Sequence, residues 1–308
     1  MQHTDLLDKP RRLPRHMPNQ RKRVEAMDVI VTMFLSLFML MIVLPFYYTL
    51  ILSLSSRATI ANIKVLLWPR QIHFGNYLLL LRTRVLYTGY LSTLMITGGG
   101  VVYGMTITVL SAYAISRPAF PLKRFFFILL LVPMFFGGGL VPAYFNLRDL
   151  GLLNSRLGII LMGGVSSFYI VIIKNSIEQI PESLTEAAKI DGANEMSIFW
   201  NVVIPLQMPM IATFTLFIAV DYWNSWFWPM MILNDLNKFP LPLVLRSIVQ
   251  STASNYYDGP AMLFNNFEIS TVGTQMATLL LTILPIMAVY PFLQKHFVKG
   301  VLVGAIKM

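Results

Sequence analysis

Long apolar runs without charge alternate with short polar segments along this chain. A helix needs about 20 residues to cross a hydrocarbon core of about 30 Å, so each uncharged apolar run of about that length predicts one transmembrane helix. The fourth run, with 17 residues, is the shortest. The pattern predicts an all-α integral membrane protein with six transmembrane helices, in the runs 29–56, 85–116, 125–147, 157–173, 196–220 and 269–294.

A strongly basic tail precedes the first run. Residues 1–27 carry seven Lys and Arg, and the apolar run begins directly afterwards. This run is far longer than the apolar part of a cleavable signal peptide, so we expect it to remain as a membrane anchor. Residues 1–27 are then a cytoplasmic tail, and residues 28–308 form the six-span domain.

The remaining charges agree with that orientation. Six spans that start from the cytoplasm place 15 Lys and Arg inside and 9 outside, and both termini inside. Inner loops of membrane proteins carry such an excess of basic residues. The first outer loop departs from the rule, because residues 57–84 contain five basic residues and no acidic one.

Composition excludes several classes of protein. Charged residues make up 12% of the chain and its mean hydropathy is +0.64, whereas a soluble domain carries about 25% charged residues. The net charge is +10, but seven of the Lys and Arg stand in the tail beside the first span, which indicates acidic lipid rather than nucleic acid as the neighbour of that tail. Cysteine is absent, which excludes disulfides and Cys-ligated metals.

The sequence also offers no candidate catalytic residues. The four His are scattered and suggest neither a metal site nor a general base. The sequence has no G-x-x-x-x-G-K-[ST] loop to hold nucleotide phosphates, so ATP-driven work would need a separate ATPase. We therefore assign no catalytic residue, metal or cofactor to this chain.

Small residues and prolines interrupt several spans. The Gly100-x-x-x-Gly104 pattern and the Gly137–Gly139 cluster are expected to allow close approach of helices. Prolines within spans can kink helices, and they lie at Pro45, Pro133, Pro142, Pro229 and Pro285.

The polar segment 178–205, between the fourth and fifth runs, reads as a helix, a turn and a second helix. Pro181 suits a first helical position, and Asp191-Gly192 supplies a left-handed stop. A second helix follows from Ala193 and reaches Pro205, with one apolar stripe at Met196, Phe199, Trp200 and Val203. The segment has a net charge of −4, which favours a docking surface for a partner. An amphipathic helix that lies on the membrane accounts for the same pattern.

These residues resemble a known family. The segments Glu186-Ala187-Ala188, Asp191-Gly192-Ala193 and Ile204-Pro205-Leu206 look like the cytoplasmic loop of permease subunits of bacterial ATP-binding-cassette (ABC) importers. The resemblance extends from about residue 27 to the end and points to the carbohydrate-uptake branch, through Trp68-Pro69, Phe74–Tyr77, Ala112–Arg117, Gly151–Ser155 and Phe297–Val301.

The resemblance implies the type I importer transmembrane domain in a bacterial inner membrane. It also implies a second permease, two ATPase subunits and an extracellular solute-binding protein as partners. In this family the loop lodges in a cleft of the ATPase and transmits its closure to the spans. The positions that match the family's coupling motif are Glu186, Ala187, Ala188, Asp191, Gly192, Ala193 and Pro205.

A polar and aromatic cluster lies in the fifth apolar run, which continues past Asp221 to about residue 231. A carboxylate inside a span costs about 3 kcal/mol on insertion scales and usually faces a cavity or a partner. We expect Asp221 and Asn224 to hydrogen-bond sugar hydroxyls, while Tyr222, Trp223 and Trp226 stack on sugar rings. The alternative is an aromatic belt at the interface, with Asp221 bonded to a neighbouring helix.

The sequence thus predicts the permease subunit of an ABC importer for a sugar or oligosaccharide. An ion-coupled secondary transporter is the first rival, but it would normally show ionisable residues within several spans, and only Asp221 is clearly there. A membrane-bound enzyme is the second. The basic first outer loop allows an acidic sugar such as a uronic acid oligomer, and docking of the binding protein accounts equally well for its charges.

Overall fold

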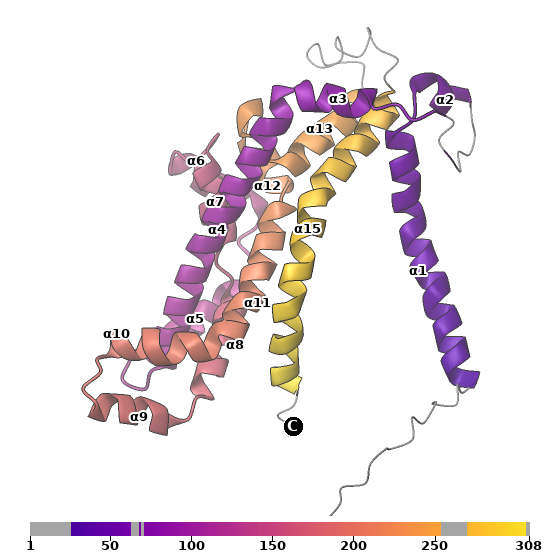
Figure 1. The fold of residues 1–308 in the computed structure, drawn as a ribbon. Helices are drawn as coiled ribbons and strands as arrows, with labels where there is room; N and C mark the ends of the chain where they lie inside the picture. Colours follow the sequence, from indigo (N-terminus) through magenta and orange to yellow (C-terminus); the bar gives the residue numbers. More distant parts are fainter. Residues whose placement is uncertain (1–25, 63–67, 69–70, 254–269, 306–308) are drawn as a thin grey trace, which may run out of the picture. The chain divides into compact units, whose positions relative to one another are not determined.

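The computed structural model describes residues 26–62, 68, 71–253 and 270–305 (Figure 1). The described residues form helices and turns, with no strand among them. They belong to two units, Met1–Tyr47 and Tyr48–Met308. Nearly all of the basic tail and the last three residues fall outside the described residues, as do 63–67 and 69–70 of the basic loop.

Helix α1 (Ala26–Ser53) makes up the described part of the first unit and extends a short way into the second. Its length confirms the predicted first span, and Pro45 is accommodated without ending the helix. The helices of the second unit, in chain order, are α2 (Arg57–Asn62), α3 (Gly75–Arg82), α4 (Arg84–Ser116), α5 (Lys123–Phe135), α6 (Leu140–Asp149), α7 (Arg156–Gly163), α8 (Ser167–Glu178), α9 (Glu182–Ile190), α10 (Glu195–Ile198), the π-helix η1 (Phe199–Val203), α11 (Ile204–Trp223), α12 (Phe227–Ile232), the 3₁₀ turn η2 (Leu236–Lys238), α13 (Leu241–Ala253) and α15 (Thr271–Ala305).

Four helical segments are long and apolar enough to cross a membrane: Met27–Ser53, Arg84–Ser116, Glu195–Trp223 and Thr271–Ala288. Two further pairs of helices reach this length only when each bent pair counts as one span. Helices α5 and α6 meet at 117°, and α7 and α8 at 48°. The prediction of several apolar spans is confirmed, but the two runs 125–147 and 157–173 are not straight helices.

The bend between α5 and α6 lies at the Gly137–Gly139 cluster. Gly139 has a φ of +84°, a conformation that side chains with a Cβ rarely adopt. No atom lies within 4 Å of a Cβ built on Gly137 or Gly138. Among the described residues, no helix packs closely on this cluster as expected; Gly139 instead allows the chain to turn.

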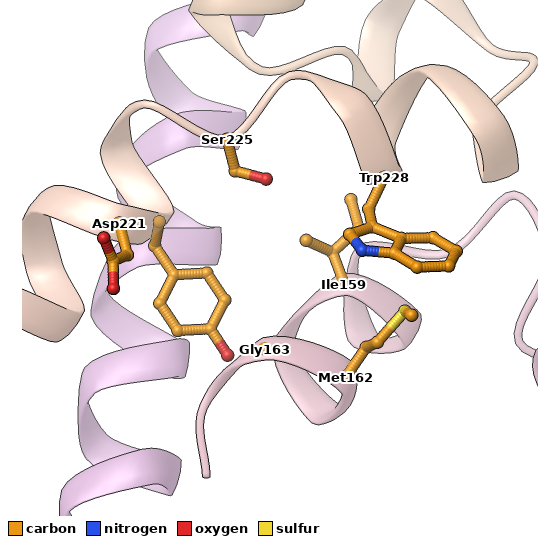
Figure 2. Close-up of a pocket in the computed structure, with 7 residues that line it drawn as sticks. Ile159, Met162, Gly163, Asp221, Ser225 and Trp228 are labelled. Carbon is orange, nitrogen blue, oxygen red and sulfur yellow. The ribbon is translucent and has the colours of Figure 1, made fainter. Parts of the chain in front are cut away.

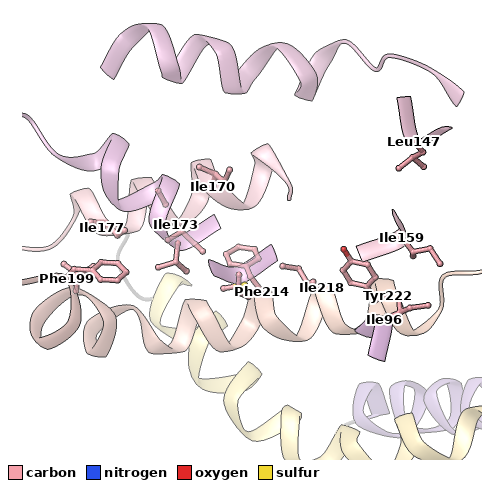
Figure 3. Close-up of a cluster of buried hydrophobic side chains, with 14 of the residues drawn as sticks. Ile96, Leu147, Ile159, Ile170, Ile173, Ile177, Phe199, Phe214, Ile218 and Tyr222 are labelled. Carbon is pink, nitrogen blue, oxygen red and sulfur yellow. The ribbon is translucent and has the colours of Figure 1, made fainter. Parts of the chain in front are cut away.

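Close packing does occur at the other glycine pattern, on α4. A Cβ on Gly104 would overlap the backbone carbonyl of Gly164, and one on Gly100 would overlap the ring of Tyr222. Helix α4 consequently packs against α11, α8 and α7 around one apolar core. Figure 3 shows this core, with Ile170 and Ile173 from α8 beside Phe214 and Ile218 from α11.

The second unit has two distinct ends (Figure 1). Helices α9 and α10 lie at one end of the α4 and α11 pair, here named the loop end, whereas α3 and α13 lie at the opposite end. Helix α11 runs from the loop end, and α12 follows it after a turn at residues 224–226. These two ends carry the two groups of candidate residues.

Candidate coupling loop and solute path

The turn between α9 and α10 adopts the left-handed stop that the sequence predicts. Gly192 has a φ of +82°. Its N–H donates to the Lys189 carbonyl at 3.0 Å, and the Ala193 N–H donates to the Ala188 carbonyl at 2.9 Å. These two bonds form a Schellman motif, which satisfies carbonyls at the end of α9. The turn therefore has one defined geometry and holds the two short helices at a set angle.

Helix α9 separates the motif residues onto two faces. Ala188 and Ala193 pack against the apolar core, whereas Glu186 and Ala187 are exposed. Ile190 is 86% exposed, although it is a large aliphatic side chain. Exposed apolar residues next to acidic ones are typical of a surface that a protein partner covers.

The second helix begins at Glu195, two residues later than expected. Asn194 caps it, with its Oδ1 accepting from the Ser197 N–H at 2.8 Å. An Asn side chain is well suited to this role because it satisfies an N–H that the helix leaves without a partner.

The predicted apolar stripe is split between two faces. Phe199 and Val203 are buried in the core, at 3% and 1% exposure, while Met196 and Trp200 are 60% and 59% exposed. The prediction of one continuous apolar face is wrong because only one edge of the stripe, Phe199 and Val203, packs on the core, while the other edge lies outside it. Met196 and Trp200 instead add exposed apolar surface beside the loop.

Pro205 does not end the second helix. The Ile204 N–H donates to the Phe199 carbonyl, five residues back, so the turn before Pro205 is wider than an α-turn. A proline ring clashes with the carbonyl four residues before it in a regular helix, and the wide turn relieves that clash. The loop helix therefore continues directly into α11, so that α10, η1 and α11 follow one another without a break.

The second group of candidates surrounds a cavity of about 230 Å³ at the end of α11. Asp221, Ser225 and Trp228 line it, and Figure 2 shows the Ser225 hydroxyl pointing toward Trp228, with Ile159 and Met162 from α7 beside Trp228. Asp221 is exposed and makes no hydrogen bond or ion pair with any residue that the structure describes. Among the described residues, no neighbouring helix holds the Asp221 carboxylate, and its contact with a solute stays a prediction.

The other candidates of this cluster have separate environments. The Tyr222 hydroxyl donates to the Ile160 carbonyl, which makes Tyr222 part of the packed wall. The Trp223 indole N–H is buried without an acceptor in the described residues. Asn224 is exposed in the turn, and the Trp226 ring lies under the Arg246 guanidinium, with 4.0 Å between Cζ and the ring centroid.

The position of Asp221 also differs from the one expected. It lies two residues before the end of α11, whereas the sequence placed it in the middle of a span that reached residue 231. The turn at residues 224–226 ends the helix there. Ser225 and Trp228 were missed because only the turn brings them into the same cavity as Asp221. Among the described residues, no group of three or more His, Cys, Asp or Glu could hold a metal ion.

Several apolar spans and a structured polar loop that continues into one of them place this chain in the class of multi-span membrane proteins. Residues 100–303 match the family described as the binding-protein-dependent transport system inner membrane component. This chain belongs to that family and is the permease subunit of an ABC importer with the type I transmembrane fold. The rival reading as an ion-coupled secondary transporter is wrong.

Several known proteins are similar to this chain over nearly its whole length. The polygalacturonan/rhamnogalacturonan transport system permease protein YtcP of Bacillus subtilis (strain 168) is 34% identical over 280 residues, covering 91% of this chain and 98% of the relative. Protein LplC of the same organism is 33% identical over 292 residues, covering 95% and 98%. A crystal structure of a bacterial ABC transporter involved in the import of the acidic polysaccharide alginate has a chain with a TM-score of 0.83 and 33% identity, covering 91% of this chain and 100% of that one.

Proposed function

We propose that this chain imports an oligosaccharide that contains uronic acids, together with a second permease, two ATPase subunits and an extracellular binding protein. One observation carries the proposal. The relative YtcP is named for polygalacturonan and rhamnogalacturonan transport, and the solved structure for import of the acidic polysaccharide alginate. Each covers 91% of this chain at 33% identity or more. Polygalacturonan and alginate both carry a carboxylate on their sugar rings.

The loop end is then the cytoplasmic side, and residues 178–205 dock on an ATPase. The exposed Glu186, Ala187, Ile190 and Asp191 provide the contact surface, while Ala188 and Ala193 pack behind it against the core. Gly192 sets the angle between the two helices, and Pro205 lies where the loop continues into the span. Both chain termini and the basic tail are cytoplasmic in this orientation, in accord with the excess of basic residues on that side.

The cavity beside Asp221 then lies near the outer end of α11 and forms part of the solute path. The free Asp221 carboxylate and the exposed Asn224 side chain accept hydrogen bonds from sugar hydroxyls, and Trp228 offers a ring face. Arg246, stacked on Trp226, supplies a cation for a sugar carboxylate, and its buried Nε makes no hydrogen bond with the described residues. Tyr222 and Trp223 form the wall behind these groups.

The substrate class can be tested with the complete complex in liposomes. We expect oligogalacturonides, added with the binding protein, to stimulate ATP hydrolysis and uptake. Galacto-oligosaccharides of the same length, which lack the carboxylates, serve as the matched control and are expected to stimulate neither. Equal stimulation by the neutral control would contradict the acidic substrate class, and no stimulation by any sugar would contradict sugar import.

Variants of the solute path separate direct contact from packing. Asp221→Asn is expected to lower uptake about fivefold, because a lost charge-assisted hydrogen bond costs about 1 kcal/mol. Arg246→Gln should weaken stimulation by oligogalacturonides. Unchanged uptake in both variants, with normal assembly of the complex, would leave these residues a structural role only.

A further inference from the structure

The segment Ala112–Arg117, at the end of α4, resembles the family but has no part in the coupling loop or the solute path described above. It leads into a short turn that ends at Lys123, the first residue of α5. This α4–α5 turn, residues 117–123, lies at the loop end of the molecule. Its two basic residues contact both sides of the coupling segment.

The first contact joins α4 to the second loop helix. The Arg117 Nε lies 3.3 Å from the Glu195 carboxylate. The Tyr113 hydroxyl donates to that carboxylate at 2.9 Å and accepts from the Arg117 Nη2 at 2.7 Å. The Tyr113 ring also packs on Phe199, with 4.8 Å between ring centroids. Tyr113, Arg117 and Glu195 thus form one closed triangle between the end of α4 and the start of α10.

The second contact joins α5 to the end of α8, where the coupling segment begins. The Lys123 Nζ lies 2.9 Å from one oxygen of Glu178. Lys174, one turn earlier on α8, lies 2.7 Å from the other oxygen and holds the carboxylate in place. The α4–α5 turn therefore contacts the coupling loop, residues 178–205, at two places: at Glu178 before α9 and at Glu195 after it.

A cavity of about 240 Å³ separates these two attachments. Arg117, Lys123 and Glu178 line it, together with Glu182 and Thr185 of α9. Helix α9 thus faces open space rather than packed side chains on this side. Because close-packed interiors resist displacement, this space allows α9 to move while the two ion pairs keep their partners.

We propose that the α4–α5 turn is a clamp through which movement of the coupling loop reaches α4 and α5 as well as α11. The inference rests on the proposed coupling role of the loop. Helix α11 is continuous with the loop, whereas α4 is connected to it in this region through Tyr113 and Arg117. Since α4 packs against α11, α8 and α7, a loop that pulled α11 alone would shear that core. The clamp lets both helices move together.

The ion pair between Arg117 and Glu195 contributes little to the stability of the fold. The Glu195 side chain is 56% exposed, and exposed pairs contribute little to the free energy of unfolding. The Arg117 side chain is only 19% exposed, and its Nε makes no aligned hydrogen bond. A small shift of the loop toward α4 would complete that bond. The arrangement therefore favours a joint that changes geometry during the transport cycle.

Charge reversal and exchange in the complete complex test the clamp. Arg117→Glu and Glu195→Arg are each expected to retain the ATPase subunits and to lower the number of solute molecules transported per ATP hydrolysed, by about fivefold. The double variant Arg117→Glu with Glu195→Arg restores this pair with opposite polarity and should recover part of that ratio, because Lys189, 3.2 Å from Glu195, then loses its own partner. Tyr113→Phe, which removes the bridging hydroxyl, should lower the ratio about twofold.

Arg124 provides the matched control. It follows Lys123 directly, has the same charge as Arg117, and makes no ion pair among the described residues. Arg124→Glu is expected to leave the ratio unchanged. An unchanged ratio in the single variants, no recovery in the double variant, or loss of the ATPase subunits from the single variants would each overturn the clamp. Failure of the unmodified chain to associate with an ATPase would instead overturn the proposed function of the loop.

Discussion

Gly192 carries the sharpest local constraint in the coupling loop. Its φ of +82° belongs to the left-handed region, yet no atom lies within 4 Å of a Cβ built there. The sequence predicts this conformation, because Asp-Gly after a helical stretch is a common stop. The cost of a substitution here is therefore conformational.

This distinction leads to a paired prediction. Gly192→Val should weaken ATPase association and solute-stimulated ATP hydrolysis, because a branched side chain in a left-handed conformation costs at least about 1 to 2 kcal/mol. Gly192→Asn should retain most of the activity, since Asn tolerates that conformation. The measurements are the amount of ATPase purified with the permease and its stimulated rate. Equal loss in both variants would point to a steric contact with the partner instead.

At the scale of whole elements, hydrophobic run length predicts that a segment is apolar but not that it is straight. The run 125–147 contains α5 and α6, which meet at 117° around Gly139. A segment with this glycine and proline content can pack closely, kink or bend sharply. Which of these occurs depends on how the neighbouring helices are arranged. The π-helix at Phe199–Val203 is a further case, because a proline at position 205 alone predicts a helix end.

The α4 packing surface can be tested with two glycines of the same helix. Gly104→Val should destabilise the isolated permease by about 1 to 3 kcal/mol, because its side chain would overlap the Gly164 backbone. Gly98→Val is the matched control, as no atom lies within 4 Å of a Cβ at Gly98. Thermal unfolding in detergent measures the difference. Equal unfolding temperatures for the two variants would contradict the close contact between α4 and residue 164.

For the molecule as a whole, the sequence predicts the membrane class, the apolar spans and the coupling segment. These features follow from local patterns: run length, charge bias and a short motif. The cavity at Asp221 and the clamp do not follow from such patterns. Glu195 lies 82 residues after Tyr113, and the pairing of these side chains depends on how α4, α8 and α11 pack. Only the tertiary arrangement identifies Ser225, Trp228 and Arg117 as members of these sites.

The central claim is that residues 178–205 form the surface on which a separate ATPase docks. A photo-crosslinking residue at Ile190, the most exposed apolar side chain of the loop, tests it directly in membranes that contain the complete transporter. We predict that illumination joins Ile190 to the ATPase subunit. The same residue at Leu236, an exposed apolar position in η2, should not capture the ATPase. Capture of the ATPase from Leu236 but not from Ile190 would contradict both the docking surface and the orientation of the chain.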